Sequence, residues 1–178
     1  MEGTPGDELV DIVDEHDRVV ATVTRRRVRA ERLRHRAVFI AVTSSTGELL
    51  VHRRSDAKDL WPGRWDLAVG GVVGAGEDYD DAARRELDEE LGATGVAPRP
   101  IGVGRFADAD VDLLARCYRV VHDGPFRFAD GEVVEARWVD APGLAELRSR
   151  ASFVPDSVAL LPLEVLFPFP PAHDPQGR

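Results

Sequence analysis

The chain has 178 residues, of which 43% are hydrophobic and 31% charged, so it is long and apolar enough for one globular domain with its own core. Its net charge of -9 argues against a protein that depends on a large nucleic-acid-binding surface. The single cysteine, Cys117, excludes an intramolecular disulfide, and the lack of a secretory h-region or a membrane-spanning apolar run predicts a cytoplasmic protein without a membrane partner.

Residues 1–34 are predicted to form a β-hairpin and an arginine-rich connector attached to the core. Apolar residues alternate over 8–13 and 18–23, and polar residues separate the two runs. The arginines that follow are Arg25, Arg26, Arg27, Arg29, Arg32, Arg34 and Arg36. They could form an electropositive rim that attracts an anionic substrate, but charge runs are more often solvated, and we favour the solvated connector. An exchange of the hairpin between two copies would give a homodimer, although nothing in the sequence demands one.

The order of strands and helices in the rest of the chain suits a mixed sheet covered on both faces, which is an α/β fold of the α/β/α sandwich type. The last segment, 163–178, is rich in proline and polar residues and is expected to be a flexible tail. The expected strands are 37–42, 48–52, 67–69, 100–106, 113–121 and 136–139, and two of the expected helices are 142–150 and a segment that starts with Asp156 as N-cap and ends before Pro162.

A glycine-rich loop leads into a third helix, which carries clustered carboxylates. Asp78 can cap this helix and Gly92 can end it, so we expect it to run from Tyr79 to Leu91. At 3.6 residues per turn, one stripe is apolar and packs into the core, and the adjacent stripe presents three carboxylates together. The apolar stripe is Ala83, Leu87 and Leu91, and the acidic stripe is Glu86, Glu89 and Glu90.

Three ionised carboxylates at one place repel each other, and their pKa values rise unless a cation lies between them. Carboxylate oxygens suit Mg2+ or Mn2+ rather than zinc, and these ions commonly bind to a few carboxylates together with substrate phosphates. The alternative is a helix whose acidic face is only solvated, but this gives no reason for the glutamates to share one stripe. The residues therefore predict a Mg2+ (or Mn2+) site that acts on a small-molecule diphosphate.

The spacing in the loop and helix resembles the signature box of the Nudix hydrolases. Gly71, Glu77, the run 85–87, the pair 89–90 and Gly92 occupy eight of the nine specified positions. The ninth position usually holds a bulky aliphatic residue and is Ala93 here. The resemblance implies a Nudix hydrolase domain over 35–162, with a Nudix-like α/β/α sandwich that hydrolyses a phosphoanhydride bond by attack of water.

The resemblance also implies a role for each matching residue. Glu86, Glu89 and Glu90 would be metal ligands, with the carbonyl of Gly71 as a further ligand. Arg85, Glu86 and Glu89 are the expected catalytic residues.

Glu77 and Arg85 interact in the family pattern, and this pairing would orient the loop against the helix and keep the glutamates directed at the metal. The general base stays open among Glu89, Glu132 and Glu135, because related enzymes recruit it from different places. We choose Glu89.

Two segments outside the box are similar to a Nudix subgroup that includes type I isopentenyl-diphosphate isomerases and their hydrolase-like relatives. They are His35-Arg36-Ala37 and the tryptophan-rich loop 61–66. This raises the alternative of an isomerase that acts by proton transfer. That isomerase needs a cysteine after the tryptophan-rich loop, and residues 66–70 contain none.

Four basic residues between the second and third expected strands are candidates for phosphate contacts, because a diphosphate needs fixed positive donors. They are Arg53, Arg54, Lys58 and Arg64, and each could equally be an ordinary surface charge. Phe39, Trp61 and Trp65 could stack on a nucleobase but more often would pack in the core. We expect a Mg2+-dependent pyrophosphohydrolase of nucleoside diphosphate-linked or similar small diphosphates, and the other class considered is a non-catalytic nucleotide-binding module.

Overall fold

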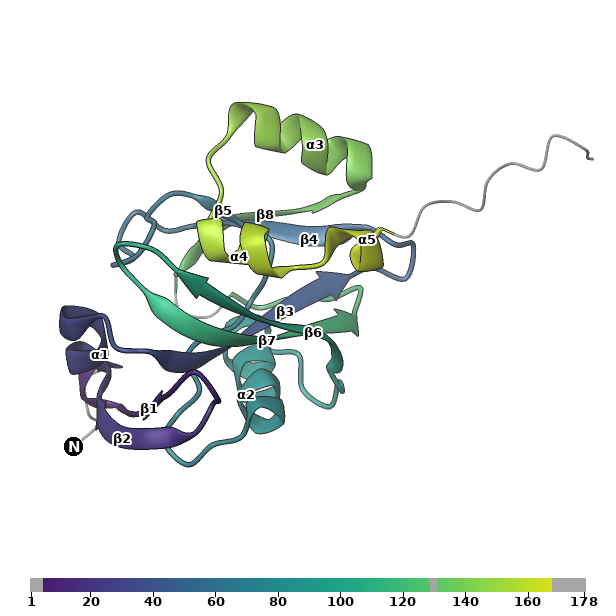
Figure 1. Cartoon of the computed structure of the whole chain (residues 1–178). Coiled ribbons are helices and arrows are strands. Elements are labelled where there is room, and N and C mark those ends of the chain that lie inside the picture. The colour runs from purple at the N-terminus through teal and green to yellow at the C-terminus, as the bar shows by residue number, and fades with distance from the viewer. Residues whose placement is uncertain (1–4, 129–130, 168–178) are drawn as a thin grey trace, which may run out of the picture.

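The structure is a computed structural model that describes residues 5–128 and 131–167. Within these residues, helices cover both faces of an eight-stranded mixed sheet (Figure 1). The strands are β1 (Leu9–Val13), β2 (Val19–Thr24), β3 (His35–Thr43), β4 (Leu49–Arg54), β5 (Trp65–Asp66), β6 (Arg99–Ala107), β7 (Asp112–Val121) and β8 (Val133–Val139). The helices are the 3-10 turn η1 (Pro5–Asp7), α1 (Arg25–Glu31), α2 (Tyr79–Leu91), α3 (Ala141–Arg150), α4 (Pro155–Leu160) and α5 (Leu163–Leu166).

β3 is the central strand of the sheet. It pairs in parallel with β7 along its whole length, and β6 pairs antiparallel with β7. The other edge of β3 is shared, because β1 pairs at one end, at His35, and β4 pairs at the other end, at Thr43. β2 extends the sheet beyond β1, whereas β5 and β8 both pair with β4.

The glycine-rich loop before α2 fills the gap that β1 and β4 leave on the edge of β3. The Ile40 amide donates to the Val69 carbonyl at 2.8 Å, and the Val38 amide donates to the Gly71 carbonyl at 2.9 Å. Ala37 and Val72 form an isolated bridge in the same stretch. The loop is therefore held by the central strand at the place where the two parts of the sheet separate.

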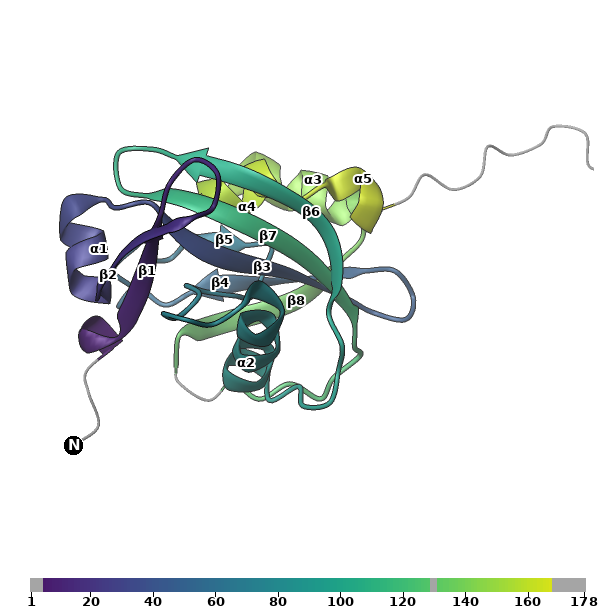
Figure 2. The ribbon, with the colours of Figure 1, turned by 60° about the horizontal axis from the view of Figure 1, so that its bottom comes forward.

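Each face of the sheet has a core of its own, which explains why the segment 37–42 is apolar at nearly every position. Val38, Ile40 and Val42 pack with α2, and Ala41 packs with the helices on the opposite face (Figure 2). The core against α2 also contains Leu87, Leu91 and Tyr118, and the opposite core contains Leu144, Leu147, Leu161 and Leu166.

The arginine segment, which we expected to be a connector, contains the helix α1. The Thr24 hydroxyl accepts a hydrogen bond from the Arg27 amide at 3.4 Å and so caps the helix. Val28 is buried in a small cluster with Val10 and Ile12 of the hairpin strand. Val28 is the buried residue of this helix. One apolar residue within a run of charges is too weak a pattern to predict a helix from the sequence.

The first residues of the expected tail, which was predicted to start at residue 163, belong to a helix. Leu163–Leu166 form α5, and Leu166 is 1% exposed because it packs into the core beneath α3. Residues 168–178 of the expected tail lie outside the described residues. The N-cap of α4 is Val154, two residues before the expected cap Asp156. None of the described helices combines the length and the apolar character needed to cross a membrane.

Candidate active site

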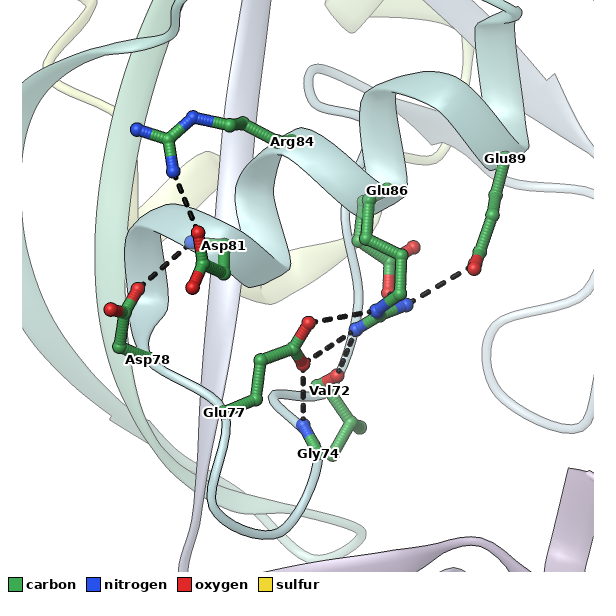
Figure 3. Close-up of polar contacts among 9 residues, drawn as sticks. Val72, Gly74, Glu77, Asp78, Asp81, Arg84, Glu86 and Glu89 are labelled. Atoms are coloured by element: carbon green, nitrogen blue, oxygen red, sulfur yellow. Dashed lines mark hydrogen bonds and ion pairs between the residues drawn. The ribbon is translucent and has the colours of Figure 1, made fainter.

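The helix α2 spans Tyr79–Leu91, as predicted, and the residues at both ends fix its position. The Asp78 carboxylate accepts a hydrogen bond from the Asp81 amide at 2.9 Å (Figure 3). Gly92 ends the helix in the left-handed region, with φ of 65°. Leu87 is fully buried against the sheet. Because the ends and one face are fixed, Glu86 is held against the glycine-rich loop.

Arg85 connects this loop to the glutamates. Its Nε and Nη2 donate to the two carboxylate oxygens of Glu77, each at 3.0 Å, and Nη2 also donates to the Val72 carbonyl at 3.2 Å. Its Nη1 donates to Glu86 at 2.7 Å and to Glu89 at 3.2 Å. Figure 3 shows Glu77 on the loop and Glu89 on the helix, with dashed lines that mark their hydrogen bonds and ion pairs. Two parallel hydrogen bonds to one carboxylate give the contact a defined geometry.

The loop approaches the helix most closely at Gly71. A β-carbon at this residue would lie 2.5 Å from Oε1 of Glu86, so no larger residue fits unless the carboxylate moves. At the neighbouring Gly70, φ is +146°, and a β-carbon there would lie 2.1 Å from the Val38 carbonyl oxygen. The two glycines therefore place the backbone between the central strand and the Glu86 carboxylate.

The carboxylates of α2 lie in different surroundings. Burial raises the pKa of Glu86, and the charge of Glu89 adds to this, whereas Arg85 acts in the opposite direction. Burial also raises the pKa of Glu90 to about 8, with further contributions from the charges of Glu86 and Asp66. The Glu89 side chain is 59% exposed. The raised pKa values of Glu86 and Glu90 thus reflect burial with too little positive charge around the two carboxylates.

Across residues 5–128 and 131–167, no three His, Cys, Asp or Glu side chains already stand in a metal-binding arrangement, and Arg85 contacts Glu86 and Glu89 instead. The donor set nevertheless fits a hard divalent cation, because such an ion would relieve the repulsion between Glu86 and Glu90. The Gly71 carbonyl accepts one hydrogen bond and keeps a second lone pair. Exposed ion pairs such as that between Arg85 and Glu89 contribute only about 0–1 kcal/mol to stability. Replacing this contact by one between Glu89 and a metal ion would therefore cost little.

A cavity of about 940 Å³ opens in front of this face of α2. Glu86, Glu89 and Glu90 line it, as do Glu77, Arg85 and the backbone around Gly71. The predicted metal ligands and the pair that orients them are therefore brought together in one hollow.

Two of the four predicted phosphate-binding residues line the cavity, and two do not. Arg54 and Lys58 belong to the lining of the cavity. Arg53 does not, because successive residues of a strand point to opposite faces, and its Nε lies 3.7 Å from Glu135 on β8. Arg64 is also outside, and it donates to the Phe153 carbonyl at 3.4 Å. The structure thus brings Arg54 and Lys58 to the cavity but places Arg53 and Arg64 outside its lining.

The two basic residues in the cavity are held by carboxylates of the same cavity. Arg54 Nη1 lies 3.5 Å from Asp66, and Lys58 bonds to Glu132. The Nε atom of Arg54 is buried, and the described residues give it no hydrogen-bond partner. Glu132 thus lies in the cavity, whereas Glu135 does not, which leaves Glu89 and Glu132 as the candidates for a general base at this site.

Several cavity residues were missed from the sequence. Arg25 and Arg29 of α1 line the cavity, and so does Asp156 at the start of α4. The sequence does contain a pattern that indicates the two arginines. Thr24 can cap a helix, and Arg25 and Arg29, which are four residues apart, would then share one face of it. Burial, with the nearby charge of Asp66, raises the pKa of Asp156 to about 7. No pattern near Asp156 in the sequence predicted that it would line the cavity.

The cavity also has an apolar wall. Phe39 and Trp61 belong to it, and the Trp61 ring packs edge-on against Phe106 with 6.4 Å between the ring centroids. Trp65 lies outside the lining and packs instead beneath the guanidinium of Arg137, at 4.6 Å. Other members of the wall are Leu60, Val111, Leu113 and Val154. A planar ring or another apolar group would fit against this wall.

Comparisons with known proteins agree with the pattern in the loop and helix. The model of the NUDIX domain family matches residues 33–160. The chain is 41% identical over 157 residues to an uncharacterized Nudix hydrolase from Yersinia pestis, with 88% of this chain and 85% of that protein covered. It is 43% identical over 159 residues to an uncharacterized Nudix hydrolase from Streptomyces coelicolor, with 86% of each chain covered.

Among solved structures, DR0079 from Deinococcus radiodurans has a similar fold. The TM-score is 0.70 at 29% sequence identity, with 85% of this chain and 96% of that chain covered. These similarities support the Nudix family, and they do not support the isomerase-like subgroup suggested by residues 35–37 and 61–66.

Proposed function

Because the chain belongs to the Nudix family and is a hydrolase of pyrophosphate bonds, we propose that its substrate is a nucleoside diphosphate-linked or similar small diphosphate, cleaved with Mg2+ or Mn2+. The observation that carries this proposal is the composition of the cavity, in which the carboxylates of α2 and the cations Arg54 and Lys58 line one hollow. Carboxylates attract the metal and cations attract the phosphate oxygens, so both requirements of a diphosphate are met at one place.

The metal would be held by Glu86, Glu89 and Glu90, with the Gly71 carbonyl as a further ligand. When bound, such an ion withdraws charge from phosphate oxygens and lowers the pKa of a water molecule. The protein supplies the positions of these groups. Arg85 is a positioning residue, because it fixes Glu77 and the loop relative to the helix.

The remaining polar residues bind the substrate and move the proton. Arg54 and Lys58 donate hydrogen bonds to phosphate oxygens. Arg54 then gives up part of its contact with Asp66, and Lys58 gives up part of its contact with Glu132. Glu89 is the proposed general base, since it lines the cavity and its exposed carboxylate is available to accept a proton from water. The wall around Phe39 holds the ring or apolar group that carries the diphosphate.

The isomerase alternative lacks its nucleophilic or acidic thiol. Cys117 is buried in β7 outside the lining of the cavity, and burial raises its pKa to about 11. A non-catalytic nucleotide-binding module would use the same cavity without turnover. The division of the chain at residues 34/35, a homodimer and a cytoplasmic location stay predictions.

The test is hydrolysis of a panel of nucleoside diphosphate-linked compounds with Mg2+ or Mn2+, followed by phosphorus NMR to identify the products. Glu90→Gln should abolish most of the turnover, and the matched control is Asp88→Asn, an exposed residue of the same helix outside the cavity. Equal rates in the parent protein and Glu90→Gln would remove the assigned site. Tight binding of panel compounds without turnover would favour the binding module.

A further inference from the structure

The helix α1 contributes two cations to the cavity from a side different from that of α2. Figures 1 and 2 both show α1 next to the β1–β2 hairpin and apart from α2 beneath the sheet. Arg25 and Arg29 of α1 nevertheless line the same cavity as the glutamates. This helix lies before residue 33, where the match to the NUDIX domain begins, so the two arginines are not part of the matched segment.

The arginines of α1 differ in how their charge is balanced. Arg25 Nη1 lies 3.0 Å from Glu8, Arg26 Nη2 lies 2.9 Å from Asp7, and Arg27 Nε lies 2.7 Å from Glu31. Arg29 is half-buried, and the described part of the chain shows no hydrogen bond or ion pair for its guanidinium. A half-buried cation without a paired anion has lost water contacts and gained nothing in return.

The surroundings of Arg29 increase this imbalance. Burial lowers the pKa of its guanidinium, and the charges of Arg25 and Arg54 add to the effect, whereas Asp59 and Asp156 act in the opposite direction. Asp156 is a weak counter-charge near neutral pH, because its own pKa is raised to about 7. Arg25 and Arg54 are paired with Glu8 and Asp66, so Arg29 is the cation among these three arginines for which the described residues supply no ion pair.

Arg25 is close enough to interact electrostatically with Glu86 of α2 as well as with Arg29. Its charge acts on both Glu86 and Arg29, and all three residues line the cavity. A substrate whose diphosphate binds beside Glu86 and that carries a further anionic group would present that group to the arginines of α1 in the same cavity.

We propose that Arg29, together with Arg25 and Arg54, forms a second anion-binding subsite, and that the substrate carries a further phosphate or similar anionic group there in addition to the diphosphate at α2. This inference rests on the proposed function, because it assigns the substrate class of the same cavity. It predicts a preference for substrates with a longer phosphate chain over those with a diphosphate alone.

The first test measures binding without hydrolysis. Metal-free protein in EDTA is titrated with tripolyphosphate in a calorimeter at constant ionic strength. Arg29→Gln should weaken binding roughly ten- to a hundredfold, the usual effect of a lost charged hydrogen bond. Arg26→Gln is the matched control, since Arg26 is on the same helix, is 69% exposed and lies outside the cavity. Arg29→Lys, which keeps the charge, should fall between Arg29→Gln and the parent protein.

The inference is overturned if Arg29→Gln binds tripolyphosphate as tightly as the parent protein, if Arg26→Gln loses as much affinity, or if the parent protein binds none. The second test compares KM values for a nucleoside triphosphate and the corresponding diphosphate. Arg29→Gln should raise KM for the triphosphate more, with kcat changed less than about twofold. If the parent protein hydrolyses neither compound and no member of the nucleoside diphosphate-linked panel, but tripolyphosphate binding still requires Arg29, the proposed function fails and the subsite stands.

Discussion

The backbone of Gly71 lies so close to the carboxylate of Glu86 that a β-carbon at residue 71 would be 2.5 Å from Oε1 and 2.8 Å from Cδ. The position of a proposed metal ligand is therefore limited by the loop as well as by its own helix. The loop is in turn held by β3, through the hydrogen bond from Val38 to Gly71. Sheet, loop and helix together determine where this carboxylate lies.

Gly71→Ala is expected to lower kcat/KM by roughly a hundredfold, because a displacement of about 1 Å at a reacting site costs that much. The free energy of unfolding should change by less than about 1 kcal/mol, since the displaced group is the end of a side chain. Gly102→Ala is the control, because a β-carbon there would lie 4.0 Å from Pro162. Steady-state kinetics and urea unfolding check both variants, and a Gly71→Ala enzyme with parental kcat/KM would refute the constraint.

Arg85→Lys keeps the positive charge but removes the pair of parallel hydrogen bonds to Glu77. We expect kcat/KM to fall at least tenfold, and the free energy of unfolding to fall by about 1–3 kcal/mol, because the Glu77 side chain, 21% exposed, loses its charged donors. Arg84→Lys should change stability by less than about 0.5 kcal/mol, since Arg84 is 56% exposed and pairs with Asp81 on the surface. Similar losses in the two variants would contradict the positioning role.

The helix α2 was predictable to the residue, because its cap, its stop and its apolar stripe are all local in sequence. Asp78, Leu87 and Gly92 each act within α2 or at its ends. The hairpin strands β1 and β2 were also predictable from local sequence, because a short polar segment separates two runs rich in β-branched residues. The helix α1 was not predicted, because five of its seven residues are charged and only the burial of Val28 against β1 distinguishes it from a solvated run.

The cavity was only partly predictable, since its lining comes from segments far apart in the chain. Arg53 and Arg54 are adjacent in sequence, and which of them faces the cavity depends on the register of β4 with β8. Asp156 reaches the cavity because α4 packs on the sheet, and nothing near it in sequence reports this. Residues of the box were identified because their spacing is fixed within one loop and one helix.

Removal of the charge at Glu90 should change how stability depends on pH. The pKa of Glu90 in the folded protein is raised to about 8 and lies above its unfolded value of about 4.3, so the folded state binds more protons between these values. Its contribution to stability is complete below pH 4.3 or so and is lost as the pH rises through about 8. In EDTA, the free energy of unfolding should therefore fall less between about pH 5 and about pH 9 for Glu90→Gln than for the parent protein. The difference is the contribution of this one group. The measurement is Tm as a function of pH, and an equal fall in Tm over this range in the variant and the parent protein would contradict the prediction.

Binding of Mg2+ should stabilise the folded protein, because the unfolded chain does not bring Glu86 and Glu90 together. At about 100 times the dissociation constant, the gain is about 2.7 kcal/mol, which raises Tm by roughly 5–10 °C for a domain of this size. Glu86→Gln combined with Glu90→Gln should abolish the shift. Scanning calorimetry with Mg2+, compared with KCl at equal ionic strength, provides the measurement, and an equal shift in the double variant would place the ion elsewhere.

Glu89 and Glu132 both line the cavity, and their variants should differ in the kinetic parameter that changes. Glu89→Gln is expected to lower kcat by about 10²–10⁴-fold, which is the usual contribution of a general base. Glu132→Gln should change KM more than kcat, because Glu132 bonds to Lys58 and the substitution alters the cation that contacts phosphate. The pH profile of kcat separates the two roles, since the acidic limb should disappear in Glu89→Gln and persist in Glu132→Gln. If the limb disappears in Glu132→Gln instead, Glu132 is the base, and Glu89 serves only the metal.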